Sequence, residues 1–321
     1  MHEIPRSTMC GAVEGVCEGG LARIVAAMVQ DSKRAHTIAT DATGILVQAK
    51  DKCRRGHVFV AIADRDHVVF HFAKKHDSTT VRELFRGFRG YLLADASSVY
   101  EALYRGDGSN LPPTEAACWA HCRRYFFKAI PSDPTRAVQG IALIDQLFAL
   151  EREIDGRPPE QKREIRRQRA GPILEAFADF RARAQAAPDV VEKSPLAAAL
   201  RYSINQWDAL RRFLDDGRLP IHNNGSELQL RHVVLGRKNW LFLGTDDFGE
   251  HACTITSLIA SAKLHDLDPE AYLRDVLRVL PHWPTTRMIE LAPKNWRTTR
   301  ERLDAQQLEQ PLGQLDIPAA Q

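Results

Sequence analysis

Hydrophobic positions change their spacing along the chain, and each change marks a different kind of predicted structure. Within residues 1–35 apolar side chains recur every three or four positions, as on one face of a helix. From residue 36 the pattern becomes short, alternating and rich in β-branched residues, which predicts three successive strands at 36–50, 57–64 and 67–73. Only two residues separate the last two strands, so we expect them to form a hairpin.

Strands and helices alternate in the next part of the chain. An apolar face with helical spacing predicts a helix at 77–89, and the run GYLLA predicts a short buried strand that ends at Asp95. We expect a second helix at 97–104, a further short strand at 115–120 and a basic helix at 121–128.

Residues 134–220 show helical spacing only, and three helices account for their apolar positions. A further helix begins near Asn223. The stretch GRKNWLFL at 236–243 is typical of a strand or loop, and the residues at 246–249 are typical of a turn.

Two more helices complete the prediction. An amphipathic pattern covers 254–264, and Asp268 followed by Pro269 is a typical start for another helix. The tail is rich in Pro, Gln and Arg, and we expect it to be poorly ordered after about residue 305.

This order of elements, β-β-β-α-β-α-β-α followed by more helices, predicts an α/β protein built on a mixed sheet. The ribonuclease H-like fold has the same order. We therefore expect a ribonuclease H-like mixed sheet with a large all-helical insertion and a helical C-terminal part. The expected segments are a helical lead-in (1–35), the first part of the core (36–133), the helical insertion (134–220), the end of the core (221–264), and a C-terminal helix with tail (265–321).

Composition narrows the class of protein. The chain of 321 residues is 44% hydrophobic, which is enough for a substantial core and excludes a disordered chain. Its net charge of +3 argues against a polybasic nucleic-acid-binding protein. No apolar run is long enough for a membrane helix, and the six cysteines include no Cys-x-x-Cys pair. We therefore expect no membrane partner, reduced thiols and a cytoplasmic location.

Two aspartates are candidates for metal-dependent chemistry. Asp41 lies in the first predicted strand and Asp95 at the end of the fourth, and these strands are neighbours in a ribonuclease H-like sheet. Two carboxylates so placed repel each other unless cations neutralise them. Mg²⁺ prefers carboxylate and water oxygens, and a pair of such ions can clamp the attacking and leaving oxygens of a phosphoryl transfer.

A third carboxylate is expected from a helix beside these strands, and Glu227 is the candidate. The long helical block between Asp95 and Glu227 is then an insertion. Other interpretations remain open. An aspartate at a strand end is often a turn former or a helix cap, and Asn224 with Glu227 also fits a capping box.

Five longer stretches resemble the insertion-sequence 66 family of bacterial DDE transposases, in the order of that family and over roughly residues 36–283. They are Gly90–Asp95 with Tyr100, Cys118–Phe126, Asn223–Glu227, Gly236–Phe242, and Ser257–Leu264 continuing through Leu267–Leu273.

The resemblance implies a ribonuclease H-like catalytic core that cuts and joins DNA ends with Mg²⁺ or Mn²⁺. Asp41 and Asp95 match the two catalytic aspartates of the family, and Glu227 matches its glutamate. The family commonly has an acidic residue directly after the first aspartate, where this chain has Ala42. Alternative acids are Asp51 or Asp64 for the first position and Glu250 for the third.

Cys118 and His121 resemble the Cys-x-x-His signature that follows the second aspartate in several DDE groups. Two ligands alone are insufficient for zinc. We therefore favour a core cysteine and a histidine that forms hydrogen bonds or lies near the scissile bond. Asn224 is a further accessory candidate in the Asn-Asn-x-x-Glu element.

Several basic side chains are candidate phosphate contacts, with ordinary surface charge as the alternative. They are Arg123, Arg124, Arg237 and Lys238. A second basic stretch, at 162–169, fits either a solvated helix face or a DNA contact. We interpret Trp119 and Trp240 as core aromatic residues rather than base-stacking platforms.

The resemblance also implies partners and alternatives. We expect the chain to bind DNA, both the ends of the element and the target, and to form a homo-oligomer there. Accessory proteins of the same element are further expected partners, and the expected location is the nucleoid of a bacterial cell. Full-length family members usually carry a longer N-terminal DNA-recognition region, so a truncated, non-catalytic remnant that binds DNA or the full-length transposase is the alternative function. A nuclease of the same fold is a third.

Overall fold

The structure, a computed structural model, describes residues 4–106, 111–309 and 315–320. The chain divides into two compact units. The first unit consists of Met1–Gly90, Glu101–Pro113 and Gly225–Gln321, and the second of Tyr91–Tyr100 and Thr114–Asn224.

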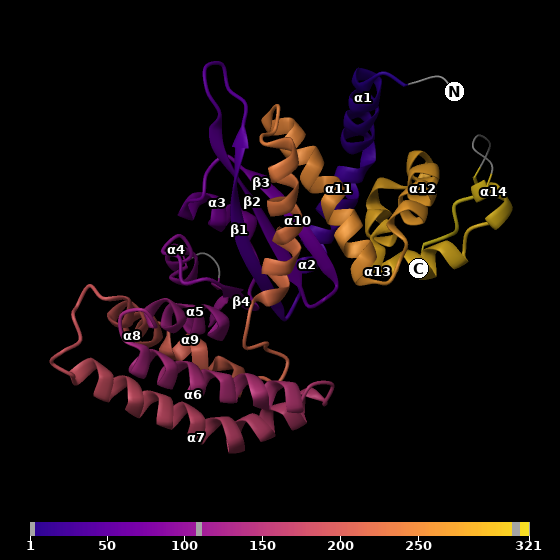
Figure 1. Cartoon of the computed structure of the whole chain (residues 1–321). Coiled ribbons are helices and arrows are strands. Elements are labelled where there is room, and N and C mark those ends of the chain that lie inside the picture. Colours follow the sequence, from indigo (N-terminus) through magenta and orange to yellow (C-terminus); the bar gives the residue numbers. More distant parts are fainter. Residues whose placement is uncertain (1–3, 107–110, 310–314, 321) are drawn as a thin grey trace. The chain divides into compact units, whose positions relative to one another are not determined.

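Three antiparallel strands form the sheet of the first unit (Figure 1): β1 (Thr37–Val47), β2 (Arg54–Ala63) and β3 (His67–Ala73). The predicted β2–β3 hairpin is confirmed. Asp64 and Arg65 form its turn with φ of 47° and 67°, and the Asp66 N–H donates to the Ala63 carbonyl at 2.7 Å. Positive φ at both central residues gives the turn that matches the twist of paired strands.

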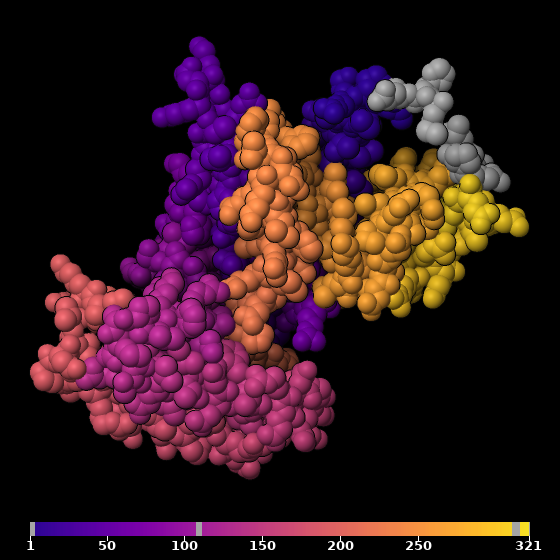
Figure 2. Space-filling model, viewed as in Figure 1, coloured from indigo at the N-terminus to yellow at the C-terminus, as the bar shows by residue number. Residues whose placement is uncertain are grey.

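Helices cover this sheet on two faces. The helices of the first unit are α1 (Arg6–Val16), α2 (Ala22–Ser32), α3 (Ser78–Leu84), α4 (Glu101–Tyr104), α10 (Asn224–Trp240), α11 (Asp246–Leu264), α12 (Pro269–Val279), α13 (Pro293–Glu301) and α14 (Ala305–Glu309). A π-helical turn at Cys17–Leu21 joins α1 to α2. In Figure 2 α10 is visible as an orange ridge on the surface of this unit.

Alternation along the strands assigns side chains to the two faces. On one face, Val47 of β1 and Val60 of β2 pack in one buried cluster with Leu230 of α10 and Cys253 of α11. On the other face, residues of α2 and α3 meet the sheet around a small cavity that includes Ile38. The sheet of the first unit is therefore covered on both sides.

Helix α11 also covers the free edge of β3. The buried hydroxyl of Ser257 accepts from the Phe70 N–H at 2.8 Å. The hydroxyl of Ser261 accepts from the Val68 N–H at 2.9 Å and donates to the Val68 carbonyl at 3.0 Å. These two serines, one helical turn apart, satisfy edge groups that would otherwise offer a template for another strand.

The second unit contains two parallel strands and a helical block. The strands are β4 (Tyr91–Ala94) and β5 (Thr114–Ala117), and the helices are α5 (Trp119–Ala129), α6 (Pro134–Glu153), α7 (Pro159–Ala186), α8 (Pro195–Asn205) and α9 (Trp207–Arg211). Aromatic rings fill its core. Trp119 is fully buried, packs edge-on against Phe177 and Trp207, and donates from its indole N–H to the Leu210 carbonyl at 2.8 Å.

The strands of the chain form a five-stranded sheet in the order β3-β2-β1-β4-β5, which contains both antiparallel and parallel pairs. The predicted α/β class, with a mixed sheet and separate helical parts, is confirmed. Within the described ranges, no helix combines the length and the apolar character that crossing a membrane requires.

Three local predictions were wrong. The stretch at 236–243 is helical as far as Trp240, because it contains no proline and its Arg237 and Lys238 favour the C-terminal end of a helix dipole. The stretch at 246–249 is the start of α11, with Asp246 and Asp247 in its first turn. The predicted helix at 97–104 is reduced to α4.

The prediction of poor order after residue 305 is wrong for residues 305–309 and 315–320, whereas 310–314 and 321 lie outside the described residues. Helix α14 follows directly, and Leu315 is buried in the cluster that includes Val276 of α12 and Trp296 of α13. The Arg287 guanidinium donates to the carbonyls of Pro318 and Ala319 at 2.8 and 3.0 Å. A composition rich in Pro and Gln therefore did not prevent packing, because apolar side chains recur within it.

Burial of His71 on β3 makes the stability of the first unit depend on pH. Burial lowers the pKa of this imidazole to about 4, so the folded protein holds it neutral. In the unfolded chain this imidazole binds a proton near pH 6.5. The contribution of His71 to the free energy of unfolding is therefore fully present above that pH and is lost as the pH falls toward 4. We expect His71 to account for a loss of about 2 kcal/mol between pH 7 and pH 5.

Urea denaturation at the two pH values checks this expectation. The variant His71→Leu, which cannot titrate, should lose about 2 kcal/mol less than the wild type over the same interval. An equal loss in both proteins would show that the pKa of His71 does not differ between the folded and the unfolded protein.

Candidate active site

Asp41 lies in the middle of β1, opposite Val60 of β2. Side chains alternate between the two faces of a strand, so Asp41 lies on the same face of β1 as Ile45 and Val47. These two residues are buried against α10 and α11, so Asp41 lies on the face that these helices cover. Its side chain is half-buried, and its Oδ1 accepts from the Ala42 N–H at 2.8 Å. A carboxylate is therefore fixed on the sheet face that α10 covers.

Glu227 lies in the first turn of α10 and is half-buried. Two contacts hold this end of the helix against the sheet. A Cβ at Gly225 would lie 3.5 Å from Cδ1 of Ile62 on β2, and Leu230 packs in the cluster that contains Val60, the strand partner of Asp41. Asp41 and Glu227 thus belong to one unit, on the same face of its sheet.

Asp95 belongs to the second unit, directly after β4, and is half-buried. Tyr202 of α8 is its electrostatic neighbour. Burial raises the pKa of the Tyr202 phenol, with smaller contributions from Cys122, Cys118, Tyr125 and Asp95. Among the described residues, the buried Tyr202 hydroxyl has no hydrogen-bond partner. Sequence analysis missed this residue, since an isolated tyrosine in a helical pattern carries no signal of its own.

The three candidate acids are therefore divided between the two units. In the part of the chain that the structure describes, no three His, Cys, Asp or Glu side chains are grouped to hold a metal ion. The chemistry of the donor set nevertheless suits Mg²⁺ or Mn²⁺, because Asp41 and Glu227 offer only carboxylate oxygens. The hydroxyl of Ser226, beside Glu227, is buried and has no hydrogen-bond partner among the described residues.

Cys118 is the core cysteine that the sequence predicted. It is fully buried, and its Sγ accepts from the Asn223 N–H at 3.2 Å. This bond ties the start of α5 to the segment that leads into α10. His121 is half-buried on α5, and Asn224 is exposed, with its N–H directed at Nδ1 of His222 at 3.4 Å.

The four candidate phosphate contacts differ in their surroundings. Arg123 forms a two-pronged pair with Asp145, at 2.6 and 3.1 Å. Arg237 donates to the Thr43 hydroxyl and the Gly44 carbonyl at 3.1 and 2.6 Å, which ties the end of α10 to β1. Arg124 and Lys238 are exposed.

The alternative acids occupy other positions. Asp64 forms the β2–β3 turn and accepts from the Thr37 N–H at 2.8 Å, which is a structural role. Asp51 lies at the exposed tip of the β1–β2 hairpin, and Glu250 is exposed on α11.

Most of the basic stretch at 162–169 is paired with carboxylates of the second unit. Lys162 lies 3.6 Å from Asp155, and Arg169 forms a pair with Glu153. Arg166 also pairs with a carboxylate, that of Glu151, but it is fully buried. Apart from this residue, the solvated helix face is the interpretation that the structure favours.

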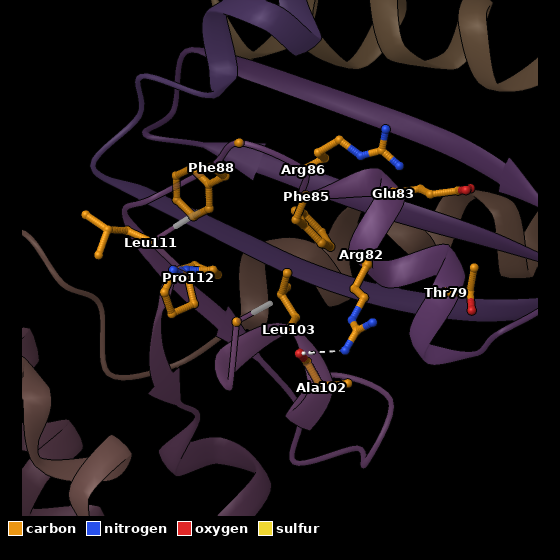
Figure 3. A pocket seen from close by; sticks show the side chains of 13 residues that line it. Thr79, Arg82, Glu83, Phe85, Arg86, Phe88, Ala102, Leu103, Leu111 and Pro112 are labelled. Atoms are coloured by element: carbon orange, nitrogen blue, oxygen red, sulfur yellow. Dashed lines mark hydrogen bonds between the residues drawn. The ribbon is translucent and has the colours of Figure 1, made fainter. Parts of the chain in front are cut away.

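A pocket of about 300 Å³ lies elsewhere in the first unit, between α3 and residues 102–106 and 111–113 (Figure 3). Phe88, Leu111 and Pro112 gather on one side of it, and Arg82 reaches the Ala102 carbonyl at 3.4 Å. None of the predicted site residues lines this pocket, so it is separate from the carboxylates.

Comparison with known proteins gives a consistent match. Residues 1–251 match the family described as “Transposase IS66 family”, and residues 257–293 match the “IS66 C-terminal element”. The chain is 28% identical over 296 residues to “Uncharacterized protein y4hP” of Sinorhizobium fredii, which covers 84% of this chain and 53% of that protein. It is 32% identical over 232 residues to “Uncharacterized protein y4jD” of the same organism, covering 70% of this chain and 45% of that one. The chain thus spans about half the length of these curated relatives.

Proposed function

The chain belongs to the transposase IS66 family, and we propose that it catalyses metal-dependent cleavage and joining of DNA strands at insertion-sequence ends. Asp41, Asp95 and Glu227 are the proposed metal ligands. The observation that carries this proposal is the position of Asp41 on the sheet face covered by α10, whose first turn carries Glu227.

The proposed chemistry follows from the charge of these side chains. Bound divalent cations would supply Lewis-acid stabilisation of the attacking and leaving oxygens in an in-line displacement. Asp41 and Glu227 supply two negative charges from a strand and a helix that pack together, and Asp95 supplies the third from the other unit. No serine or tyrosine nucleophile is needed, since water and then a DNA 3′-hydroxyl attack directly.

Basic side chains would hold the DNA backbone. Arg124 and Lys238 are the proposed phosphate contacts among the four basic candidates, because both are exposed to solvent. Such contacts position DNA without reading its sequence. We further propose that the active form is a homo-oligomer on DNA, with accessory proteins of the same element, in the bacterial cytoplasm.

A strand-transfer assay tests this function. The purified chain is incubated with Mn²⁺, a pre-nicked end of its own insertion sequence, and target plasmid. The expected result is covalent joining of the nicked 3′ end to the plasmid, which EDTA abolishes. Cleavage of any DNA without joining would favour a nuclease of the same fold, and activity that resists EDTA would contradict the metal-dependent mechanism.

A further inference from the structure

Three consecutive large apolar side chains at the end of α10 are exposed. Trp240, Leu241 and Phe242 are 41%, 63% and 42% exposed, respectively. The prediction that Trp240 is a core residue is therefore wrong, whereas Trp119 is buried as predicted. Single exposed apolar residues are common, but three in succession indicate a surface that something covers.

The backbone holds this turn in a constrained conformation. Leu241 has φ of 58°, a left-handed conformation that is unfavourable for a leucine. Leu243, two residues later, is buried, and its backbone donates to the Leu46 carbonyl and accepts from the Gln48 N–H, both at 2.8 Å. The turn is thus anchored to β1 directly after its exposed side chains.

The position of the Trp240 ring depends on a glycine. A Cβ at Gly236, one helical turn earlier, would lie 2.7 Å from Nε1 of Trp240. The indole therefore lies over a position that has no side chain. Any larger residue at 236 would displace the ring.

Cations lie beside these apolar side chains. The pairing of Leu243 with β1 brings the turn next to the β1–β2 hairpin, whose exposed tip carries Lys50 and Lys52 together with one acid, Asp51. Figures 1 and 2 show the end of α10 next to this hairpin. We call the combined surface the Trp240 platform; its exposed apolar residues are Trp240, Leu241 and Phe242, with Lys50, Lys52 and Lys238 as its cations.

We propose that the Trp240 platform binds a DNA strand whose bases are unpaired. Exposed aromatic rings stack on bases of any sequence, and neighbouring lysines and arginines pair with the phosphates. The choice of DNA rests on the proposed function. A second copy of the chain fits less well, because a symmetric contact through this surface would bring its cations against the same cations.

The length of α10 determines where along the bound DNA strand the Trp240 platform would lie. Trp240 lies thirteen residues after Glu227, which is about 20 Å along the helix at 1.5 Å per residue. If the DNA between the two places is a B-form duplex, that distance corresponds to about six nucleotides at 3.4 Å each. The platform would therefore hold bases about half a helical turn away from the reacting phosphate, outside the carboxylate site.

Fluorescence anisotropy with the full chain tests this proposal, using a labelled single-stranded oligonucleotide and the blunt duplex of the same sequence. Trp240→Ala should weaken single-strand binding by roughly 5- to 150-fold, the range for loss of one stacked base. Trp240→Phe should retain most of the affinity. The control variant Phe127→Ala removes a similarly exposed ring from α5 and should leave binding unchanged.

Gly236→Ala separates a binding role from a structural one. This change favours the helix by up to about 1 kcal/mol but displaces the indole, so single-strand affinity should fall while stability does not. Lys52→Ala should lower the salt dependence of binding by about 0.7 in the logarithmic slope, the value for one phosphate contact on a single strand.

The outcomes distinguish this inference from the proposed function. Unchanged single-strand affinity in Trp240→Ala and Gly236→Ala would overturn the platform, whatever the catalytic activity. Conversion of a dimer into a monomer by Trp240→Ala, with unchanged DNA affinity, would overturn it in favour of a contact between copies. Trp240-dependent binding in a protein that joins no strands would support the platform and contradict only the proposed catalysis.

Discussion

Replacement of Glu227 by Gln is expected to reduce strand transfer by about a thousandfold or more, because the loss of one metal ligand removes several kcal/mol of transition-state stabilisation. The change keeps the size of the side chain and removes its charge. Glu227 is only half-buried, so the variant should fold normally. Joining of a pre-nicked end in Mn²⁺, together with thermal unfolding, measures both effects.

The matched control for this prediction is Glu250→Gln. Glu250 is the alternative third acid and is exposed on α11, so its replacement should change activity less than about threefold, as for a surface position. Asp41→Asn and Asp51→Asn form the corresponding pair for the first acid. If Glu250→Gln or Asp51→Asn abolished joining while its partner variant did not, the assignment of the acids would have to change.

Arg166→Ala is expected to destabilise the helical block of the second unit by about 3–5 kcal/mol, the cost of breaking a buried ion pair. The Arg166 side chain is fully buried on α7. It forms two hydrogen bonds with Glu151 of α6, at 2.8 and 2.7 Å. It also donates to the carbonyls of Phe213, Asp216 and Leu219, at 2.9, 3.0 and 2.9 Å. One guanidinium therefore joins two helices and the segment after α9.

Arg169→Ala is the control for this variant. Arg169 pairs with Glu153, also between α7 and α6, but these two side chains are 51% and 53% exposed. An exposed pair contributes about 0–1 kcal/mol. Urea denaturation followed by circular dichroism should thus separate the two variants by at least about 2 kcal/mol. Equal stabilities would show that the buried bonds of Arg166 contribute little.

Periodicity predicted the elements of this chain well where apolar side chains face one core. The alternating pattern of β1 to β3 and the helical spacing of 134–220 correspond to buried positions, so the strands and helices follow from the sequence. Periodicity failed to predict the structure of the stretch GRKNWLFL at 236–243, where Trp240 and Phe242 are apolar but exposed. A rule that assigns aromatic residues to the core cannot detect a surface that binds a partner.

The candidate site was predictable only in part. The sequence placed Asp41 on a strand and Glu227 on a helix, and both placements are confirmed. The helical insertion that separates Glu227 from Asp95 places Asp95 in the other unit, which residue spacing does not reveal. The Tyr202 hydroxyl, which has no hydrogen-bond partner within the described residues, and the buried bonds of Arg166 both depend on contacts between distant segments, so no local pattern signals them.

Binding of Mn²⁺ tests the central claim, that carboxylates from both units form one metal centre. The full chain is assembled with a pre-nicked DNA end, and bound Mn²⁺ is counted by electron paramagnetic resonance in the wild type, Asp41→Asn, Asp95→Asn and Glu227→Gln. The proposal predicts two magnetically coupled ions per wild-type chain and loss of the coupled signal in every variant. A coupled signal of wild-type intensity in Asp95→Asn would contradict it.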